Sequence, residues 1–148
     1  MAEFAHDKVV PFKNSERSKK EQVADMFDRI SGKYDFLNGF LSAGIDVRWR
    51  RKALQQIKGR PVQHLLDVAT GTAEVAIMAE KILQPNQITG IDISEGTFEA
   101  GRQKINKLGI GSKINLLTGD SEAIKFNDHT FDAVTVAFGV RNFGNLEK

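Results

Sequence analysis

A turn of small residues follows the apolar run that begins at His64, and an acidic residue stands near the end of that run. Residues 65–74 read LLDVATGTAE, so Asp67 comes shortly before a turn centred on Gly71. Such a turn between a strand and a helix lets a ligand approach the backbone closely, and the amides at the helix start can receive its polar atoms. Gly71 is the residue suited to a positive φ angle. The alternative is a strand–helix turn that binds nothing, because short motifs are weak signals.

Asp92 stands at the end of the next apolar run, 21 positions after Gly71. A carboxylate placed there can accept hydrogen bonds from both hydroxyls of a ribose. The alternative role, capping the following helix, suits Ser94 as well as Asp92. Both assignments hold together if Ser94 caps the helix and Asp92 faces a nucleoside. The G-x-G-x-x-G fingerprint of dinucleotide-binding proteins is absent, which argues against a hydride-transfer cofactor.

Two further polar segments follow later apolar runs. Asp120 and Ser121 lie in the sequence TGDS, where Asp120 can accept from an adenine amino group and Ser121 can meet a ring nitrogen. Arg141 and Asn142 lie in FGVRNF, where arginine can stabilise a phenolate and asparagine can hold a carbonyl or hydroxyl. Taken singly, these segments are equally typical of a turn and a solvated loop.

The segments between these sites alternate between strand and helix. Short apolar runs typical of buried strands occur at 64–69, 87–91, 113–117 and 131–138. Helical spacing over 74–83 and 95–108 predicts two helices, the second facing the core through Phe98, Ile105 and Leu108. Such repeats predict an α/β fold with a doubly wound, mostly parallel Rossmann-like sheet. Ligands of such sheets bind at the carboxyl ends of the strands, where all four polar segments converge.

The N-terminal part of the chain has a different pattern. Residues 1–18 lack periodicity and predict an extended or disordered arm. Residues 19–59 predict a helical cap, in which two helices meet at a bend at Ser31-Gly32 and Asp46 caps a third helix. Residues 60–148 then form the α/β core, which stops soon after its fourth strand, so the sheet is expected to be incomplete.

Composition excludes several classes of protein. The chain of 148 residues is 41% apolar and 27% charged, as in ordinary globular proteins, and its net charge of +2 does not indicate a nucleic-acid partner. It contains no cysteine, which excludes disulfides, thiolate metal sites and cysteine nucleophiles. No apolar run approaches the roughly 20 residues that span a bilayer. We therefore expect a cytoplasmic protein without a metal site.

The sequence resembles the ubiquinone/menaquinone biosynthesis C-methyltransferase family from Phe27 to Asn142. The motifs that carry the resemblance are YDFLN at 34–38, LSAG at 41–44, RWR at 48–50, DVATGTA at 67–73, GIDIS at 90–94, FD at 131–132 and FGVRN at 138–142. The chain departs from the family pattern at Ala73, where many relatives have glycine, and at Asp120, where many have asparagine.

The resemblance implies transfer of the S-adenosylmethionine methyl group to a ring carbon of a prenylated quinol. The substrate would be demethylmenaquinol or its equivalent in the ubiquinone pathway. The resemblance also implies a set of cofactor-binding residues: Asp67, Gly71, Thr72, Asp92, Asp120 and Ser121. We hypothesise that Arg141 and Asn142 stabilise the substrate oxygen as it becomes anionic, and that Tyr34 encloses or orients the ring.

Two other functions remain as alternatives. The first is a non-catalytic cofactor-binding fragment, because members of the family continue for several more strands and helices, and a truncated chain is expected to lack part of the substrate pocket. An incomplete sheet would also expose an apolar face, which pairing with a second copy as a homodimer would cover. The second is a nicotinamide-dependent oxidoreductase, which the missing glycine fingerprint disfavours.

Basic residues cluster in the cap between Arg48 and Lys52. They can attract the anionic surface of the membrane in which a prenylated quinone resides, giving peripheral contact at the inner membrane surface. The favoured interpretation of the same residues is a solvated helix face with Trp49 buried.

Overall fold

Four parallel strands form the centre of the computed structural model, which describes residues 10–12, 15–42 and 44–143, with only the backbone of 31–41, 141 and 142. The strands are β1 (His64–Val68), β2 (Gln87–Asp92), β3 (Ile114–Thr118) and β4 (Ala133–Val136). The order of the strands across the sheet is β3-β2-β1-β4. The chain adds β2 and β3 on one side of β1 and then returns to add β4 on the other side, so the order reverses between β1 and β4. This is the switch point at which open α/β sheets bind ligands.

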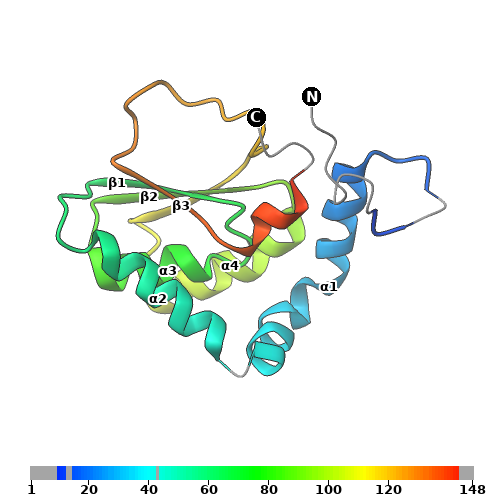
Figure 1. Ribbon diagram of the computed structural model, residues 1–148, viewed down its shortest axis with the longest axis horizontal. Coiled ribbons are helices and arrows are strands. Elements are labelled where there is room, and N and C mark those ends of the chain that lie inside the picture. Colours follow the sequence, from blue (N-terminus) through cyan, green and yellow to red (C-terminus); the bar gives the residue numbers. More distant parts are fainter. Residues whose placement is uncertain (1–9, 13–14, 43, 144–148) are drawn as a thin grey trace.

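Helices cover one face of this sheet (Figure 1). They are α2 (Ile45–Ile57), α3 (Glu74–Leu83) and α4 (Glu95–Leu108). The core between these layers contains Leu54, Leu65, Ile88 and Phe98, each at most 1% exposed. On the other face, Leu66, Val68 and Ile91 pack against three phenylalanines, Phe126, Phe131 and Phe143.

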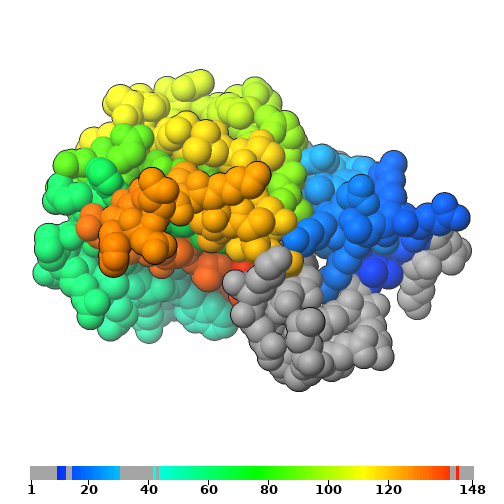
Figure 2. Space-filling model, turned by 90° about the horizontal axis from the view of Figure 1, so that it is seen from above, coloured from blue at the N-terminus to red at the C-terminus, as the bar shows by residue number. Residues whose placement is uncertain are grey.

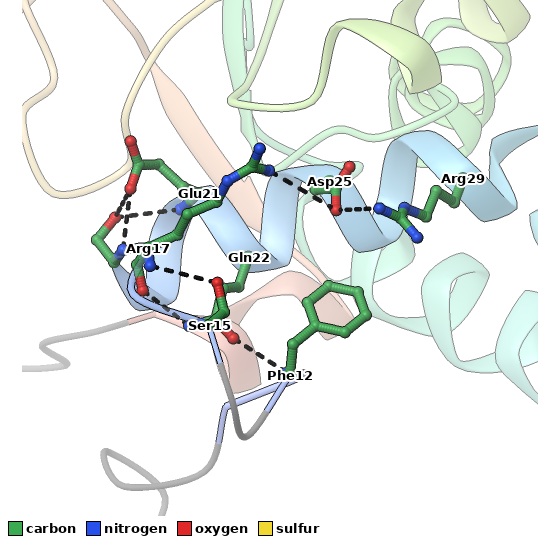
Figure 3. Close-up of polar contacts among 8 residues, drawn as sticks. Phe12, Ser15, Arg17, Glu21, Gln22, Asp25 and Arg29 are labelled. Carbon is green, nitrogen blue, oxygen red and sulfur yellow. Dashed lines mark hydrogen bonds and ion pairs between the residues drawn. The ribbon is translucent and has the colours of Figure 1, made fainter.

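The first helix, α1 (Lys19–Ser42), begins with reciprocal hydrogen bonds between Ser18 and Glu21 (Figure 3). The Glu21 backbone N–H donates to Ser18 Oγ at 3.3 Å, and the Ser18 N–H donates to Glu21 Oε2 at 2.9 Å. This capping box satisfies two backbone donors and fixes the start of the helix. Gln22 ties the preceding segment to the helix, since its Oε1 accepts from the Phe12 N–H and its Nε2 donates to the Arg17 carbonyl.

Most of the expected core elements are confirmed. The bounds of α3 and α4 match the predicted helices, and the four strands occur in the predicted places, although β4 is shorter than expected. The prediction of a parallel, Rossmann-like α/β sheet is therefore confirmed. Leu108 was expected to face the core but is 47% exposed, because the inward face of α4 ends at Ile105.

The N-terminal helices differ from the expectation in three ways. The two helices expected on either side of Ser31-Gly32 are one helix, since α1 continues through both residues. Gly44 precedes α2 in a left-handed conformation, so Asp46 lies in the first turn and is not the cap. Trp49 is 61% exposed, because Leu54 is the residue of α2 that packs into the core. The division into arm, cap and core stays a prediction.

Candidate functional site

A cleft of about 1000 Å³, including its open mouth, lies at the carboxyl ends of the strands. All six residues expected to bind a cofactor line it: Asp67, Gly71, Thr72, Asp92, Asp120 and Ser121. Lys20 of α1 and Arg50 of α2 also line the cleft. Figure 2 shows α1, in blue, beside the yellow segment that follows β3. The structure thus brings the six predicted residues to one cleft, whereas the sequence patterns did not indicate Lys20 or Arg50.

Asp67 lies in β1, and its side chain is buried beneath the cleft. Its two carboxylate oxygens accept hydrogen bonds from the hydroxyls of Thr70 at 2.6 Å and Thr135 at 2.7 Å. Burial raises the pKa of Asp67 from 3.8 to about 6, although the two threonine hydroxyls and the charge of Arg50 oppose the rise. Asp67 therefore joins the turn after β1 to the neighbouring strand β4.

The turn after β1 has an unusual backbone. Gly71 has the expected positive φ, at 55°, but Ala69 and Ala73 also have positive φ angles, of 53° and 63°. Only glycine adopts this region without steric cost, so the two alanines are strained. Gly139 approaches so closely that a Cβ there would lie 2.5 Å from the Cβ of Ala69. The missing side chain lets η2 (Phe138–Asn142), a 3-10 helix, lie against this turn.

Asp92 connects the turn after β1 with the turn after β2. Its Oδ2 accepts from the Gly71 N–H at 2.9 Å, and its Oδ1 accepts from the Ser94 N–H at 3.0 Å. Burial raises the pKa of Asp92, while these backbone donors act in the opposite direction. Each carboxylate oxygen keeps further acceptor capacity for a ligand hydroxyl.

Ser94 caps α4, as expected, since its Oγ accepts from the Thr97 N–H. The same hydroxyl donates to Asp28 Oδ1 of α1 at 2.6 Å, and the Gly96 N–H also donates to Asp28 at 2.9 Å. An acidic side chain at a helix N-terminus is favourable because the exposed N–H groups carry partial positive charge. Asp28 therefore fastens α1 against the loop that carries Asp92.

Asp120 lies just beyond β3 and is bonded to α1. Lys20 Nζ lies 2.7 Å from Asp120 Oδ2 and 2.8 Å from Glu122 Oε2. Hydrogen bonds to Asp120 and Glu122 raise the pKa of Lys20, despite some opposing desolvation. The Asp120 Oδ1 also accepts from the Glu122 N–H at 2.9 Å. These contacts place α1 across the β3 end of the cleft.

Three residues predicted to act on the substrate, Tyr34, Arg141 and Asn142, have side chains that lie outside the described residues. The backbone of Arg141 and Asn142 belongs to η2, directly after β4. Within the described ranges, no group of three or more His, Asp or Glu residues is arranged to hold a metal ion.

The parallel sheet and the cleft at its strand ends define a Rossmann-like α/β protein. Solved structures share this fold. One is the [4+2]-cyclase SpnF, with a TM-score of 0.61 at 19% identity over 78% of this chain and 48% of that one. Another is a putative S-adenosyl-L-methionine-dependent methyltransferase from Methanococcus maripaludis, with a TM-score of 0.60 at 17% identity over 87% of this chain and 55% of that one.

Sequence relatives are more specific. A profile of the ubiE/COQ5 methyltransferase family matches residues 15–148, and the chain belongs to this family. It is 48% identical to a demethylmenaquinone methyltransferase of Bacteroides fragilis over 98% of this chain and 59% of that protein. It is 46% identical to a ubiquinone/menaquinone biosynthesis C-methyltransferase UbiE of Geotalea daltonii over 84% of this chain and 53% of that protein. The chain thus spans little more than half the length of these relatives.

The raised pKa of Asp67 predicts how stability depends on pH. A carboxyl group with a higher pKa in the folded state stabilises the fold when protonated, and this contribution is lost as pH rises from about 3.8 through about 6. Replacing Asp67 with Asn removes the titrating group. Relative to the parent, the free energy of unfolding of Asp67→Asn should therefore improve by about 2 kcal/mol between about pH 4.5 and about pH 7. Urea unfolding at both pH values measures the difference.

Asp132 provides a control of opposite sign. Its pKa is lowered by hydrogen bonds from the His64 and Gln63 N–H groups, so its stabilising contribution is present at neutral pH and lost in acid. Asp132→Asn should lose stability at neutral pH and less in acid. A parallel response of the two variants would contradict the assignment for Asp67.

Proposed function

We propose that this chain binds S-adenosylmethionine and forms part of an enzyme that methylates a ring carbon of a prenylated quinol. The observation that carries the proposal is the convergence of Asp67, Asp92 and Asp120, from three adjacent strand ends, on one cleft. The names of the relatives from Bacteroides fragilis and Geotalea daltonii support the reaction and the quinone substrate.

The cleft residues fit the parts of this cofactor. Asp92, at the end of β2, accepts the ribose hydroxyls, and its bonds to the Gly71 and Ser94 N–H groups keep it oriented. Asp120 and Ser121, after β3, receive the adenine ring. The turn with Gly71 and Thr72 lies beside the amino-acid part, because β1 is the next strand along the sheet.

S-adenosylmethionine supplies an electrophilic methyl group on a sulfonium. The chain's part is to hold an electron-rich ring in line with that group and to exclude water. Arg141, acting through a water, and Asn142 stabilise the quinol oxygen as it loses its proton, which enriches the adjacent ring carbon. Tyr34 encloses the ring. When bound, the cofactor would supply the methyl group and keep the methyl–sulfur electron pair, while the ring carbon would lose its hydrogen as a proton.

The cofactor assignment predicts binding of S-adenosylhomocysteine with an affinity that depends on Asp92. Asp92→Ala removes a charged acceptor for the ribose and should weaken binding by roughly 10- to 100-fold in calorimetric titration. Asp128→Ala, an exposed carboxylate in the loop before β4, is the matched control and should bind as the parent does. Binding of NAD in preference to S-adenosylhomocysteine would instead favour an oxidoreductase.

The catalytic assignment predicts transfer of a labelled methyl group to reduced demethylmenaquinone in detergent micelles. Arg141→Ala should lower the turnover number about 100-fold with little change in cofactor affinity, because the arginine acts on charge that develops during the reaction. Mass spectrometry of the extracted quinone measures the product. A chain that binds S-adenosylhomocysteine but transfers no methyl group would support the alternative, a non-catalytic cofactor-binding fragment.

The exposed face of α2 favours an additional, peripheral contact with a membrane. Trp49 is 61% exposed, and Arg48, Arg51 and Lys52 beside it are also exposed. Aromatic and basic side chains together are typical of surfaces that bind anionic lipid headgroups. No helix in the described part of the chain is long and apolar enough to cross a membrane.

This surface predicts sedimentation with vesicles that contain anionic lipids at low salt. Trp49→Ala combined with Arg51→Gln should reduce the bound fraction several-fold, because it removes an interfacial anchor and one of the basic charges. Vesicles of neutral phosphatidylcholine are the control. Equal binding to both vesicle types would count against an electrostatic contact.

A further inference from the structure

Arg50 is a largely buried cation between the cleft and α2. Its side chain is 12% exposed, and its Nη2 lies 3.1 Å from Asp46 Oδ2, one turn earlier in the helix. Its guanidinium carbon lies 5.6 Å from the centroid of the Phe138 ring, which follows β4. Arg50 also lines the cleft beside Asp67 and lowers the pKa of that residue by its charge.

One polar atom of Arg50 lacks a partner. Its Nε is buried and donates no hydrogen bond to any residue in the described part of the chain. Asp46 itself accepts from Ser42 Oγ at 2.6 Å, so the carboxylate that holds Arg50 is fixed. A buried guanidinium donor without an acceptor costs free energy, so the protein alone compensates the burial of this cation only in part.

The charges around the cleft are uneven. Its described lining contains five carboxylates, from Asp67, Glu74, Asp92, Asp120 and Glu122, but only two cationic side chains, from Lys20 and Arg50. This excess of negative charge suits the sulfonium and ammonium groups of the proposed cofactor. The α-carboxylate of the same cofactor is repelled everywhere except close to a cation.

The order of the strands separates the two cations. Lys20 is bonded to Asp120 and Glu122, beyond the end of β3, where the adenine lies in the proposed cofactor orientation. Arg50 lies at the opposite end of the cleft, beside Asp67 of β1 and Phe138 after β4. A cofactor with its ribose at Asp92 extends its amino-acid part from β2 across β1 toward β4, and so toward Arg50.

We infer that Arg50 binds the α-carboxylate of S-adenosylmethionine, with Asp46 as the residue that positions it. This inference rests on the proposed cofactor. Arginine suits the role because its planar guanidinium presents several donors to a carboxylate and stays charged when buried. The contact with Phe138 holds the guanidinium at the β4 side of the cleft.

The test compares two ligands that differ by one carboxylate. S-adenosylhomocysteine and its decarboxylated analogue, which keeps the adenosine, sulfur and amine, are titrated calorimetrically into the full chain. The parent should bind S-adenosylhomocysteine about 10- to 100-fold more tightly than the analogue. Arg50→Gln should abolish this preference, because it weakens binding of S-adenosylhomocysteine and leaves or improves binding of the analogue.

Lys58→Gln, at an exposed cation directly after α2, is the matched control and should keep the preference of the parent. If Arg50→Gln does not fold, as judged by thermal unfolding, Arg50→Lys replaces it and should reduce the preference, since lysine keeps the charge but lacks the planar donor pair. An equal loss of affinity for both ligands in the Arg50 variant, or a parent with no preference, overturns the inference while the cofactor proposal stands. Failure of the parent to bind S-adenosylhomocysteine at all contradicts the proposed function itself.

Discussion

The buried carboxylate of Asp67 is the point at which the sheet and the cleft are joined. Its bonds to Thr70 and Thr135 tie the turn after β1 to β4, the strand on the other side of the switch point. A parallel sheet separates at its switch point because the connections leave it in opposite directions, and that separation creates a crevice. The hydrogen bonds of Asp67 at the bottom of this crevice fix the separation between the ends of β1 and β4. The cleft therefore depends on a carboxyl group whose pKa is raised by burial, against the effect of the two hydroxyl donors.

The strained turn after β1 depends on the same bonds. Ala69 and Ala73 both hold positive φ angles, each at a cost on the order of 1 kcal/mol. The Asp67–Thr70 bond and the Gly71–Asp92 bond hold the segment between them in place. The result is a turn whose backbone approaches the cleft without a large side chain in the way. Strain of this kind persists only where surrounding contacts stabilise it, and the hydrogen bonds of Asp67 and Asp92 on either side of the turn supply such contacts.

The sequence predicted the helices and strands of the core well, because the spacing of apolar residues along the chain indicates where these elements lie. The bounds of α3 and α4 follow from apolar spacing, and the positive φ of Gly71 follows from its place in a small-residue turn. The predictions were wrong where tertiary contacts decide. Trp49 is exposed although it shares a helix with buried Leu54, and nothing in the spacing of α2 distinguishes the face that meets α3.

The residues of the candidate site were likewise predictable where the strand pattern determines their place, and not where contacts between distant parts of the chain do. Residues at strand ends were predictable, because parallel strands bring their carboxyl ends to one edge. Lys20 and Asp28 bond to residues 100 and 66 positions later in the chain. Arg50 contacts Phe138, which follows β4 on the other side of the switch point. The residues of the Ser18–Glu21 capping box indicate where α1 begins, but they do not indicate which part of the chain α1 packs against.

The electrostatics of the cleft link these long-range contacts to the proposed chemistry. An acid-rich cleft attracts a sulfonium strongly, but it also stabilises the charged cofactor relative to its neutral thioether product. Two cations at opposite ends limit that effect: Lys20 offsets Asp120 and Glu122, and Arg50 offsets Asp67. Between them lies Asp92, where the proposed cofactor would place its ribose. Since α1 and α2 supply both cations, the helices that precede the sheet determine the charge balance of the site, and the strands determine its geometry.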